Sequence, residues 1–488
     1  MEHTTKTVKQ HNDSCATLFC DSDFPPSKQS LYENPDDPDN KDRQWMRPRE
    51  ISKKPQMFVN GAHRGDVQQG DLGDCWFLSA CSAIAQIPEL INKVIPPNQV
   101  LDGKGYTGKL KFNFWSMGEW ETVEIDDRLP VDDDEQLVYS RCTAENEFWL
   151  PLLEKAFAKF QGNYEILEGG HLVEGFVNLT GFFVENVIIA NEDKNELYRR
   201  LRVERKHKSL LTCSRASQYT QGLVGDHGYT ITDLKRITYE GKLLRMVRVR
   251  NPWGYEEWTG AWSDGDSRWH SLDKEVKKEL GYNRADDGEF WMKFVHFTTR
   301  FLEVCIATVV PAVGASRADG TANKMFVIHD SWRAGVNAGG SQNDVRSFAT
   351  NPQYLLSVEE EDDPESEYEE DSEEGKDKSH KKTCHVLMDL MQEHRRRRQR
   401  DLYFIALFVI KCPQTRKDER LTVSELQETV DVVASTDYDS ISSVMLRLEL
   451  DVGEKYVLIP ATFEPNQERK FLLRVFSRKP VKVRELLP

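Results

Sequence analysis

The sequence predicts an α+β protein. A region that contains both helices and strands is followed by an antiparallel β-sandwich. Apolar residues recur at helical spacing in segments such as 148–160, which indicates helices that bury one face. From residue 171 to about residue 309 the strand-like content rises. After about residue 325, short alternating runs such as 446–450 and 471–476 are typical of sandwich strands. At 488 residues, the chain is long enough for about three domains.

Composition narrows the class of protein. A net charge of −16 argues against nucleic acid, a polyanion, as the main partner. Residues 1–14 are polar and lack the apolar core of a signal peptide, and the longest apolar run, 402–410, is too short to span a bilayer. The 9 cysteines form no CxxC pair and no zinc spacing, which indicates free thiols. We therefore expect a cytoplasmic protein in a reducing compartment.

One octet, 69–76, organises the first half of the chain. Its sequence, QGDLGDCW, predicts a turn, and the run that follows Cys75 has no helix breaker until Pro88. Cys75 is therefore expected at a helix N-terminus, where unpaired N–H groups and the positive dipole end stabilise a thiolate. Gln69 lies six residues earlier, where an amide folded back beside the sulfur would stabilise an oxyanion. A cysteine considered alone, however, is more often a small buried core residue.

A thiolate nucleophile needs a base, and the base needs a group that orients it. His227 stands at the start of a predicted strand that follows a glycine-rich turn. A second predicted strand, 244–250, ends at Asn251, and side chains at strand ends emerge toward a cleft. A lone His or Asn in such a position is more often structural. The order Cys, His, Asn is nevertheless that of papain-like proteases, and the three residues together predict cysteine-protease chemistry.

With these motifs in place, the sequence closely resembles the calpain cysteine proteases from about residue 30 to about residue 477. The resemblance is carried by the octet and by three further segments, HGYTIT at 227–232, RNPWG at 250–254 and the run 257–264. It implies a two-lobed papain-like cysteine protease core followed by an antiparallel β-sandwich domain. It implies that Cys75 is the nucleophile and that His227 is the general base and acid. Asn251 would orient His227, and Gln69 would donate a hydrogen bond to the oxyanion.

The expected lobes meet at Gly169-Gly170, so that the nucleophile and the base lie on opposite sides of a hinge. An error of about 1 Å between them costs roughly a hundredfold in rate, so anything that sets the lobe angle can switch such an enzyme. The expected units are a flexible N-terminal tail (1–28), lobe one with the Cys75 helix (29–169), lobe two with His227 and Asn251 (170–309), and the β-sandwich (310–488) with an acidic loop at 359–374.

Acidic residues and loop carbonyls in both lobes are candidate ligands for calcium, which takes six to eight oxygens. Scattered acids of this kind are more often only a solvated face. The resemblance favours calcium as a cofactor and implies one site in each lobe, where Val59, Gly61 and Ala285 would act through backbone carbonyls. The implied ligands are Val59, Gly61, Asp66 and Glu147 in lobe one, and Glu257, Asp264, Ala285, Asp287 and Glu289 in lobe two.

The acidic run 359–374 has 12 Asp or Glu residues in 16 positions, and four arginines follow at 395–398. Such density cannot fold into a core unaided, so a solvated loop is the simpler interpretation. The alternative is an electrostatic switch, in which the loop pairs with basic residues at a lobe boundary or binds calcium near a membrane. The β-sandwich is accordingly a candidate contact with an anionic membrane surface.

Two departures from the family pattern matter. No EF-hand loop occurs in the sequence, so neither an EF-hand domain nor a heterodimer with a small subunit is expected. Asp226 precedes His227, where the family usually has glycine. If the Asp226 side chain faces the cleft, its charge raises the pKa of His227, whereas a side chain that faces solvent is screened.

The sequence therefore predicts a calcium-dependent intracellular cysteine endopeptidase that performs limited proteolysis of protein substrates. Trp253 is expected to cover the His–Asn pair from water, and Arg64 to form an ion pair across the lobes with an acid such as Glu289. The rival interpretation is a non-catalytic calcium- and membrane-binding regulatory relative, against which the intact set of four site residues argues. A form that folds without an EF-hand domain but works poorly is a third interpretation.

Overall fold

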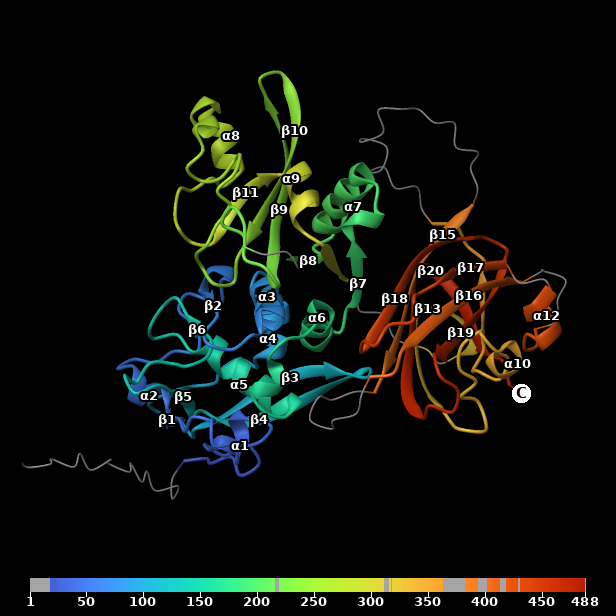
Figure 1. The fold of residues 1–488 in the computed structure, drawn as a ribbon, viewed down its shortest axis with the longest axis horizontal. Coiled ribbons are helices and arrows are strands. Elements are labelled where there is room, and N and C mark those ends of the chain that lie inside the picture. Colours follow the sequence, from blue (N-terminus) through green and yellow to red (C-terminus); the bar gives the residue numbers. More distant parts are fainter. Residues whose placement is uncertain are drawn as a thin grey trace, which may run out of the picture.

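The computed structural model describes residues 18–215, 219–310, 316, 318–362, 382–393, 402–412, 418–428 and 431–487. The acidic run from residue 363 onward and the arginines 395–398 lie outside these residues. Figure 1 shows a lobe in blue and cyan, a second lobe in green above it, and a β-sandwich in orange and red beside both. The fold is α+β with a sheet-rich domain after the two lobes, as predicted. No helix in the described part of the chain is long and apolar enough to cross a membrane.

Lobe one is built on two helices, α3 (Cys75–Ile84) and α5 (Trp149–Gln161), where the apolar spacing predicts them. The rings of Phe77 and Phe157 stack with their centroids 4.1 Å apart, which holds the two helices face to face. The other elements are α1 (Lys28–Leu31), β1 (Gln44–Met46), α2 (Pro48–Ile51), β2 (Val67–Gln68), α4 (Pro88–Val94), β3 (Lys109–Ser116), β4 (Glu119–Asp126), β5 (Leu129–Val131) and β6 (Arg141–Cys142).

Helix α6 (Leu172–Thr180) follows Gly169-Gly170 but packs on lobe one. A Cβ on Gly175 would lie 3.0 Å from the Trp76 carbonyl oxygen, so α6 approaches α3 too closely for most side chains. The apolar residues of α6 belong to the same core as those of α3. The chain therefore reaches the sheet of lobe two only after Gly181, beyond the glycine pair at which the hinge is expected.

Lobe two contains a six-stranded antiparallel sheet with the order β11-β10-β9-β8-β12-β7. Strand β9 (His227–Tyr239) begins at His227, and its neighbour β10 (Lys242–Arg250) ends one residue before Asn251. Both candidate site residues thus stand at the same end of the sheet. In Figure 1 the lower end of β9 lies above α3. The other elements are β7 (Phe183–Ile188), α7 (Lys194–Lys206), β8 (Leu210–Arg215), α8 (Lys274–Glu279), β11 (Glu289–Lys293), α9 (Phe294–Arg300) and β12 (Glu303–Thr308).

The sandwich is organised by its last strand, β20 (Arg469–Glu485). The part of β20 up to Ser477 pairs with β15 (Thr383–Gln392), and the part from Val481 pairs with β14 (Tyr354–Val358). One long strand therefore joins both layers, with Pro480 between the two pairings. The other elements are β13 (Asp319–Trp332), α10 (Val345–Phe348), β16 (Ile405–Cys412), α12 (Val423–Glu428), β17 (Asp431–Ser435), β18 (Ser443–Asp451) and β19 (Lys455–Thr462).

Strand β20 is buried on both faces, although the alternating pattern of 471–476 predicts one face in the core. Phe471, Leu473 and Val475 pack inside the sandwich. Leu472 and Phe476, on the other face, are buried with residues of the protease core. The second face is therefore covered by another part of the molecule, and its apolar residues account for the imperfect alternation.

Arg474, on that second face, binds the segment that joins the two lobes. Its guanidinium forms a buried ion pair with Asp389 of β15. It also donates hydrogen bonds to the carbonyl oxygens of Gly181 at 2.6 Å and Phe182 at 3.0 Å. The sandwich is thus attached directly to the connection between α6 and β7, where the chain passes from one lobe to the other.

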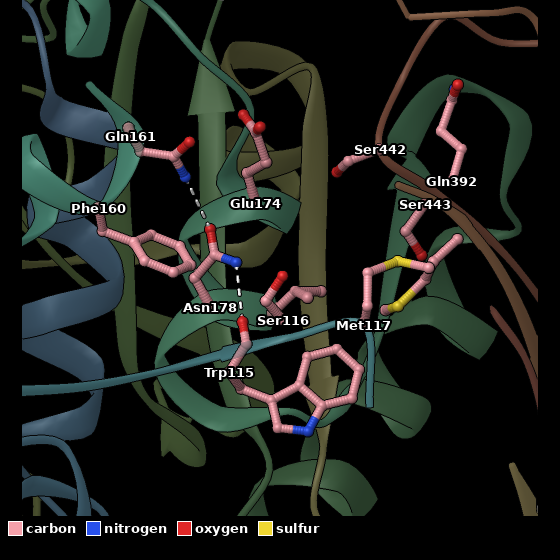
Figure 2. Close-up of a pocket in the computed structure, with 12 residues that line it drawn as sticks. Trp115, Ser116, Met117, Phe160, Gln161, Glu174, Asn178, Gln392, Ser442 and Ser443 are labelled. Atoms are coloured by element: carbon pink, nitrogen blue, oxygen red, sulfur yellow. Dashed lines mark hydrogen bonds between the residues drawn. The ribbon is translucent and has the colours of Figure 1, made fainter. Parts of the chain in front are cut away.

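A small pocket lies at the same junction of lobe one and the sandwich. Figure 2 shows the amide of Asn178 between the Gln161 amide and the Trp115 carbonyl oxygen, with hydrogen bonds of 3.2 and 3.0 Å. Gln392 and Ser443 of the sandwich line the opposite side. The contact between the two domains is therefore partly polar as well as apolar.

The cysteines differ from the expectation at one position. Seven described cysteines are free thiols, and of these only Cys75 is not fully buried. Cys20, in contrast, is disulfide-bonded. Partial exposure distinguishes Cys75 from the structural thiols of the described chain, because a buried thiol is inaccessible to reactants.

Candidate active site

Helix α3 begins at Cys75 with Asp74 as its N-cap, so the sulfur lies at the helix N-terminus that the octet predicts. The pKa of the Cys75 thiol is nevertheless raised, because burial disfavours the thiolate more than a hydrogen bond from the Gly228 N–H favours it. The charge of Asp74 acts in the same direction as burial. In this structure the thiol is therefore the favoured form, contrary to the expectation from the helix dipole alone.

The strand that carries His227 lies against the first turns of α3. Its second residue, Gly228, hydrogen-bonds the Cys75 sulfur, and a Cβ there would lie 3.5 Å from the Cys75 carbonyl oxygen. The Thr230 hydroxyl donates to the Ser79 carbonyl oxygen at 3.1 Å. These contacts place the strand that begins at His227 against the helix that begins at Cys75.

His227 and Asn251 are hydrogen-bonded to each other, with 2.8 Å between Nε2 and Oδ1. The Asn251 amide donates to the carbonyl oxygens of Tyr255 at 2.9 Å and Glu256 at 3.1 Å, which turns its oxygen toward the imidazole. An accepting oxygen at Nε2 selects the neutral tautomer that carries its proton there. Nδ1 is then the unprotonated nitrogen, which is the state a general base requires.

Trp253 covers this pair, as predicted. Its ring centroid lies 4.8 Å from that of His227, and its backbone N–H donates to Asn251 Oδ1 at 3.0 Å. Only 5% of His227 and none of Asn251 is exposed. Exclusion of water strengthens the hydrogen bond between these two residues.

Gln69, the predicted oxyanion donor, is held at both ends of its amide. Its nitrogen donates to the Leu72 carbonyl oxygen at 2.6 Å, and its oxygen accepts the indole N–H of Trp253 at 2.8 Å. One amide N–H of Gln69 is not used by these bonds. The bond to Trp253 crosses between the lobes and has no signature in the sequence, since 184 positions separate the two residues.

Of the two alternatives for Asp226, the one in which its charge raises the pKa of His227 is not the one observed. Burial lowers the pKa of His227 to about 4, and the hydrogen bond to Asn251 offsets only part of that effect. Asp226 is exposed, so the solvent-facing alternative holds. Its backbone is left-handed, with φ 46°, a conformation that suits glycine better than aspartate and is consistent with the usual family residue.

Two arginines join the lobes near the site. The predicted ion pair is confirmed, with 3.0 Å between Arg64 Nη2 and Glu289 Oε2. Sequence reasoning missed Arg250, which donates to the carbonyl oxygens of Asp287 at 2.6 Å and Gly65 at 3.3 Å. The signal for Arg250 was its place at the end of a strand, directly before Asn251.

The predicted calcium ligands of lobe one lie around Glu147. Glu147 Oε1 accepts the Val59 N–H at 2.7 Å, and Asp66 Oδ2 accepts the His63 N–H at 2.6 Å. Burial, together with the charge of Asp66, raises the pKa of Glu147 to about 7. Burial also raises the pKa of Asp66. Val59, Asp66 and Glu147 are thus brought together, and Gly61 lies in the same loop.

The predicted ligands of lobe two form a cluster of loop residues. Glu257 Oε1 accepts the N–H groups of Asp287 at 3.0 Å and Gly288 at 2.9 Å, and Asp264 Oδ2 lies 3.4 Å from the Ala285 nitrogen. Burial raises the pKa of Glu257 to about 7 and that of Asp264 to about 6, and repulsion from neighbouring acids adds to both shifts. Glu289, the remaining ligand candidate, instead faces Arg64 across the lobes.

Both clusters have the donor chemistry of a calcium site, because carboxylates and loop carbonyls are the oxygens this cation prefers. Acids that are held close together without a countercharge have raised pKa values, and a divalent cation would compensate them. Among the described residues, however, no group of three or more His, Cys, Asp or Glu side chains could hold a metal ion. The residues fit calcium in kind but do not form a closed cage of side chains.

Comparison with known proteins agrees with this geometry. A model of the calpain family cysteine proteases matches residues 19–308, and a model of calpain large subunit, domain III, matches residues 328–476. The chain is 38% identical to calpain-9 of Rattus norvegicus, over 99% of this chain and 68% of that protein. It is 36% identical to the calpain-1 catalytic subunit of Sus scrofa, over 98% and 67% respectively. The chain thus spans about two thirds of the length of these relatives.

Proposed function

The chain belongs to the calpain family of cysteine proteases, and from that premise we propose that it is a calcium-dependent endopeptidase that cleaves proteins at a limited number of sites. The observation that carries the proposal is the hydrogen bond of 2.8 Å between His227 Nε2 and Asn251 Oδ1, beside the helix that begins at Cys75. This bond leaves Nδ1 unprotonated, which is the state in which an imidazole accepts a proton from a thiol.

In the proposed reaction, His227 Nδ1 takes the proton of the Cys75 thiol, and the thiolate attacks the carbonyl carbon of the substrate. The Cys75 N–H and the second amide N–H of Gln69 stabilise the oxyanion. The intermediate collapses to a thioester as His227 passes the proton to the leaving amine. Water, deprotonated by His227, then hydrolyses the thioester, and the thiol is restored.

The proposed resting state is a neutral thiol beside a neutral imidazole. Burial raises the pKa of Cys75 and lowers that of His227, so both shifts oppose the thiolate–imidazolium pair. A small change in the alignment of the lobes alters the burial and the separation of both groups. Regulation through the lobe contacts therefore has a direct route to the reactivity of the thiol.

Calcium is the proposed regulator, and it would be held by the two acid clusters. The proposed ligands are Val59, Gly61, Asp66 and Glu147 in lobe one, and Glu257, Asp264, Ala285, Asp287 and Glu289 in lobe two. When bound, calcium supplies the positive charge that these carboxylates lack. Arg64 and Arg250 contact loops of both clusters, and through them the state of the acids bears on the alignment of the lobes.

We further propose protein substrates, a cytoplasmic location and contact of the sandwich with an anionic membrane surface, all of which rest on the sequence. The second candidate function is that of a calcium- and membrane-binding regulatory relative without turnover. The hydrogen-bonded His227–Asn251 pair argues against it, because a protein without turnover has no use for an oriented base.

Casein cleavage tests the proposal. In millimolar calcium the protein is expected to cleave casein, and a strong chelator or the substitution Cys75→Ala is expected to abolish cleavage. Cleavage that persists in the chelator would contradict calcium dependence, and cleavage by the Cys75→Ala protein would place the nucleophile elsewhere. A wild-type protein that binds calcium without cleaving any substrate would favour the regulatory relative.

A further inference from the structure

Two fully buried acids lie directly behind the predicted nucleophile. Asp74 is the residue before Cys75 and the N-cap of α3, and Glu154 projects from α5. None of Asp74 and only 1% of Glu154 is exposed. The reaction described above uses neither residue, and buried carboxyl groups without a cationic partner are uncommon because their desolvation is costly.

The surroundings of these acids favour a proton shared between them. Both oxygens of Glu154 face the Ser140 N–H, at 3.2 and 3.1 Å. Among the described residues, no side chain other than Glu154 and no backbone N–H other than that of Asp74 itself interacts with the Asp74 carboxyl as a hydrogen-bond partner. Two carboxylates would repel each other there without water to screen them. One shared proton converts the contact into an O–H···O bond.

The Asp74 side chain is not engaged in helix capping. An aspartate at the N-cap ordinarily accepts a backbone N–H of the first turn through its side chain. Helix α3 has no such bond, and the backbone carbonyl of Asp74 alone accepts the N–H groups of Phe77 and Leu78, at 2.9 and 3.1 Å. The carboxyl is therefore turned away from the helix end and toward Glu154.

Burial raises the pKa of Asp74 to about 7 and that of Glu154 well above its usual value, with mutual repulsion contributing at Glu154. The other titratable groups that interact with the pair are Cys75 and Cys81 of α3, and Tyr139 and Tyr164 of the segments beside α5. Burial raises the pKa of each of these four groups, so they are uncharged near neutral pH. The charge of the acid pair, in contrast, changes near neutral pH.

We propose that Glu154 is a positioning residue for the nucleophile: it carries a proton that it shares with Asp74, and thereby limits the negative charge buried beside Cys75 and fixes the turn that starts α3. Glu154 acts through Asp74 and touches no reacting atom. The proposal rests on the proposed function only in taking Cys75 as the nucleophile. It adds a second proton-binding group beside Cys75, in addition to His227.

The test is the rate at which iodoacetamide alkylates Cys75 between pH 5 and pH 9, measured by mass spectrometry of the Cys75 peptide. This reaction reports the thiolate and requires no proteolysis. The wild-type protein should show one inflection near neutral pH from the acid pair and a second at higher pH from the thiol. Glu154→Gln offers an amide N–H that stabilises the Asp74 carboxylate, so the first inflection should move to lower pH.

Asp74→Asn provides a second variant that keeps a hydrogen-bonding partner for Glu154. It removes a negative charge adjacent to Cys75, and a change of about one pKa unit in the thiol corresponds to alkylation about tenfold faster at neutral pH. Glu89→Gln, at an exposed glutamate of α4, is the matched control and should reproduce the wild-type profile. Circular dichroism verifies that each variant is folded.

Superimposable profiles of the wild type and the folded Glu154→Gln protein would overturn the proposal. If Glu154→Gln does not fold, an Asp74→Asn rate equal to that of the wild type overturns it in the same way. The proposed function fails separately, if the wild-type protein shows the two inflections but cleaves no casein in calcium.

Discussion

The acids behind the nucleophile and the acids of the lobe-two cluster are the same kinds of residue in different surroundings. Asp74 and Glu154 are fully buried, and the Asp74 carboxyl interacts with the Glu154 carboxyl. Asp264 and Glu257 are half-buried, and each faces backbone N–H groups of a loop. Burial raises the pKa in both pairs, but only the second pair is reachable by an ion from solvent. Access to water thus decides whether paired acids hold a proton or bind a cation.

Substitution of the proposed nucleophile tests whether peptide cleavage and calcium binding by the acids are independent. It has the largest expected effect on the rate of cleavage. Cys75→Ala should lower casein cleavage by about 10⁴-fold or more, because it removes the proposed nucleophile. The substitution leaves all four acids in place, so calcium should raise the thermal unfolding temperature of the variant as much as that of the wild type. Loss of the calcium effect together with cleavage would mean that the acids and the nucleophile are not independent.

Substitution of Arg64 tests whether the half-buried acids are coupled to the alignment of the lobes. Arg64→Ala removes the 3.0 Å ion pair with Glu289, and kcat/KM at saturating calcium should fall about tenfold, since small displacements between nucleophile and base are costly. The control is Lys482→Ala, which breaks a solvent-exposed ion pair with Glu359 on the surface of the sandwich domain. It should change kcat/KM by less than about twofold. Equal rates for the two variants would remove Arg64 from the coupling.

His227 extends the comparison to a buried base. Burial raises the pKa of an acid but lowers the pKa of a base, because in both cases it disfavours the charged form. Burial lowers its pKa to about 4 in the folded protein, against 6.5 ordinarily. Between these pH values the unfolded chain binds the proton more readily, so the free energy of unfolding contributed by this group falls as the pH drops from about 6.5 to about 4. The free energy of unfolding, measured with urea at several pH values, should fall less steeply toward acid pH for His227→Gln than for the wild type. Parallel curves would show that burial does not set the protonation of His227.

Asp226 is an exposed acid, and its substitution is expected to have the smallest effect on activity. Asp226→Gly should leave the pH dependence of casein cleavage unchanged, because the carboxylate faces solvent. The unfolding free energy should rise by about 0.5 kcal/mol, as relief of the left-handed backbone exceeds the entropy that glycine adds to the unfolded chain. Lys208→Gly, at another left-handed position, should give a similar gain. A shifted pH profile would place the Asp226 charge in the site after all.

Local patterns were sufficient to predict the elements that carry the candidate site. Glycines and a breaker-free run predicted the helix at Cys75, and a glycine-rich turn predicted the strand that starts at His227. The pattern at 471–476 did not predict that the outer face of β20 is covered, because that face contacts a distant part of the chain. Helix α6 likewise has the sequence of an ordinary amphipathic helix, and only tertiary packing assigns it to the core of lobe one.

The same limit applies within the site. The ion pair between Arg64 and Glu289 was predicted because both residues stand beside motif residues. The partners of Arg250 and of Glu154 were not, because a buried charged group is identified only by the groups it meets in the folded chain. The neutral state favoured for Cys75 was missed for the same reason, since burial and not position on the helix dominates its pKa.

Isothermal titration of the Cys75→Ala protein with calcium tests most directly whether the accessible acids bind the cation and the buried pair does not. With this substitution as background, Asp66→Asn and Asp264→Asn should each bind one ion fewer than the parent, whereas Glu154→Gln should bind as many as the parent. Unchanged stoichiometry in both aspartate variants, or a site lost in Glu154→Gln, would contradict the distinction between acids that bind calcium and acids that share a proton.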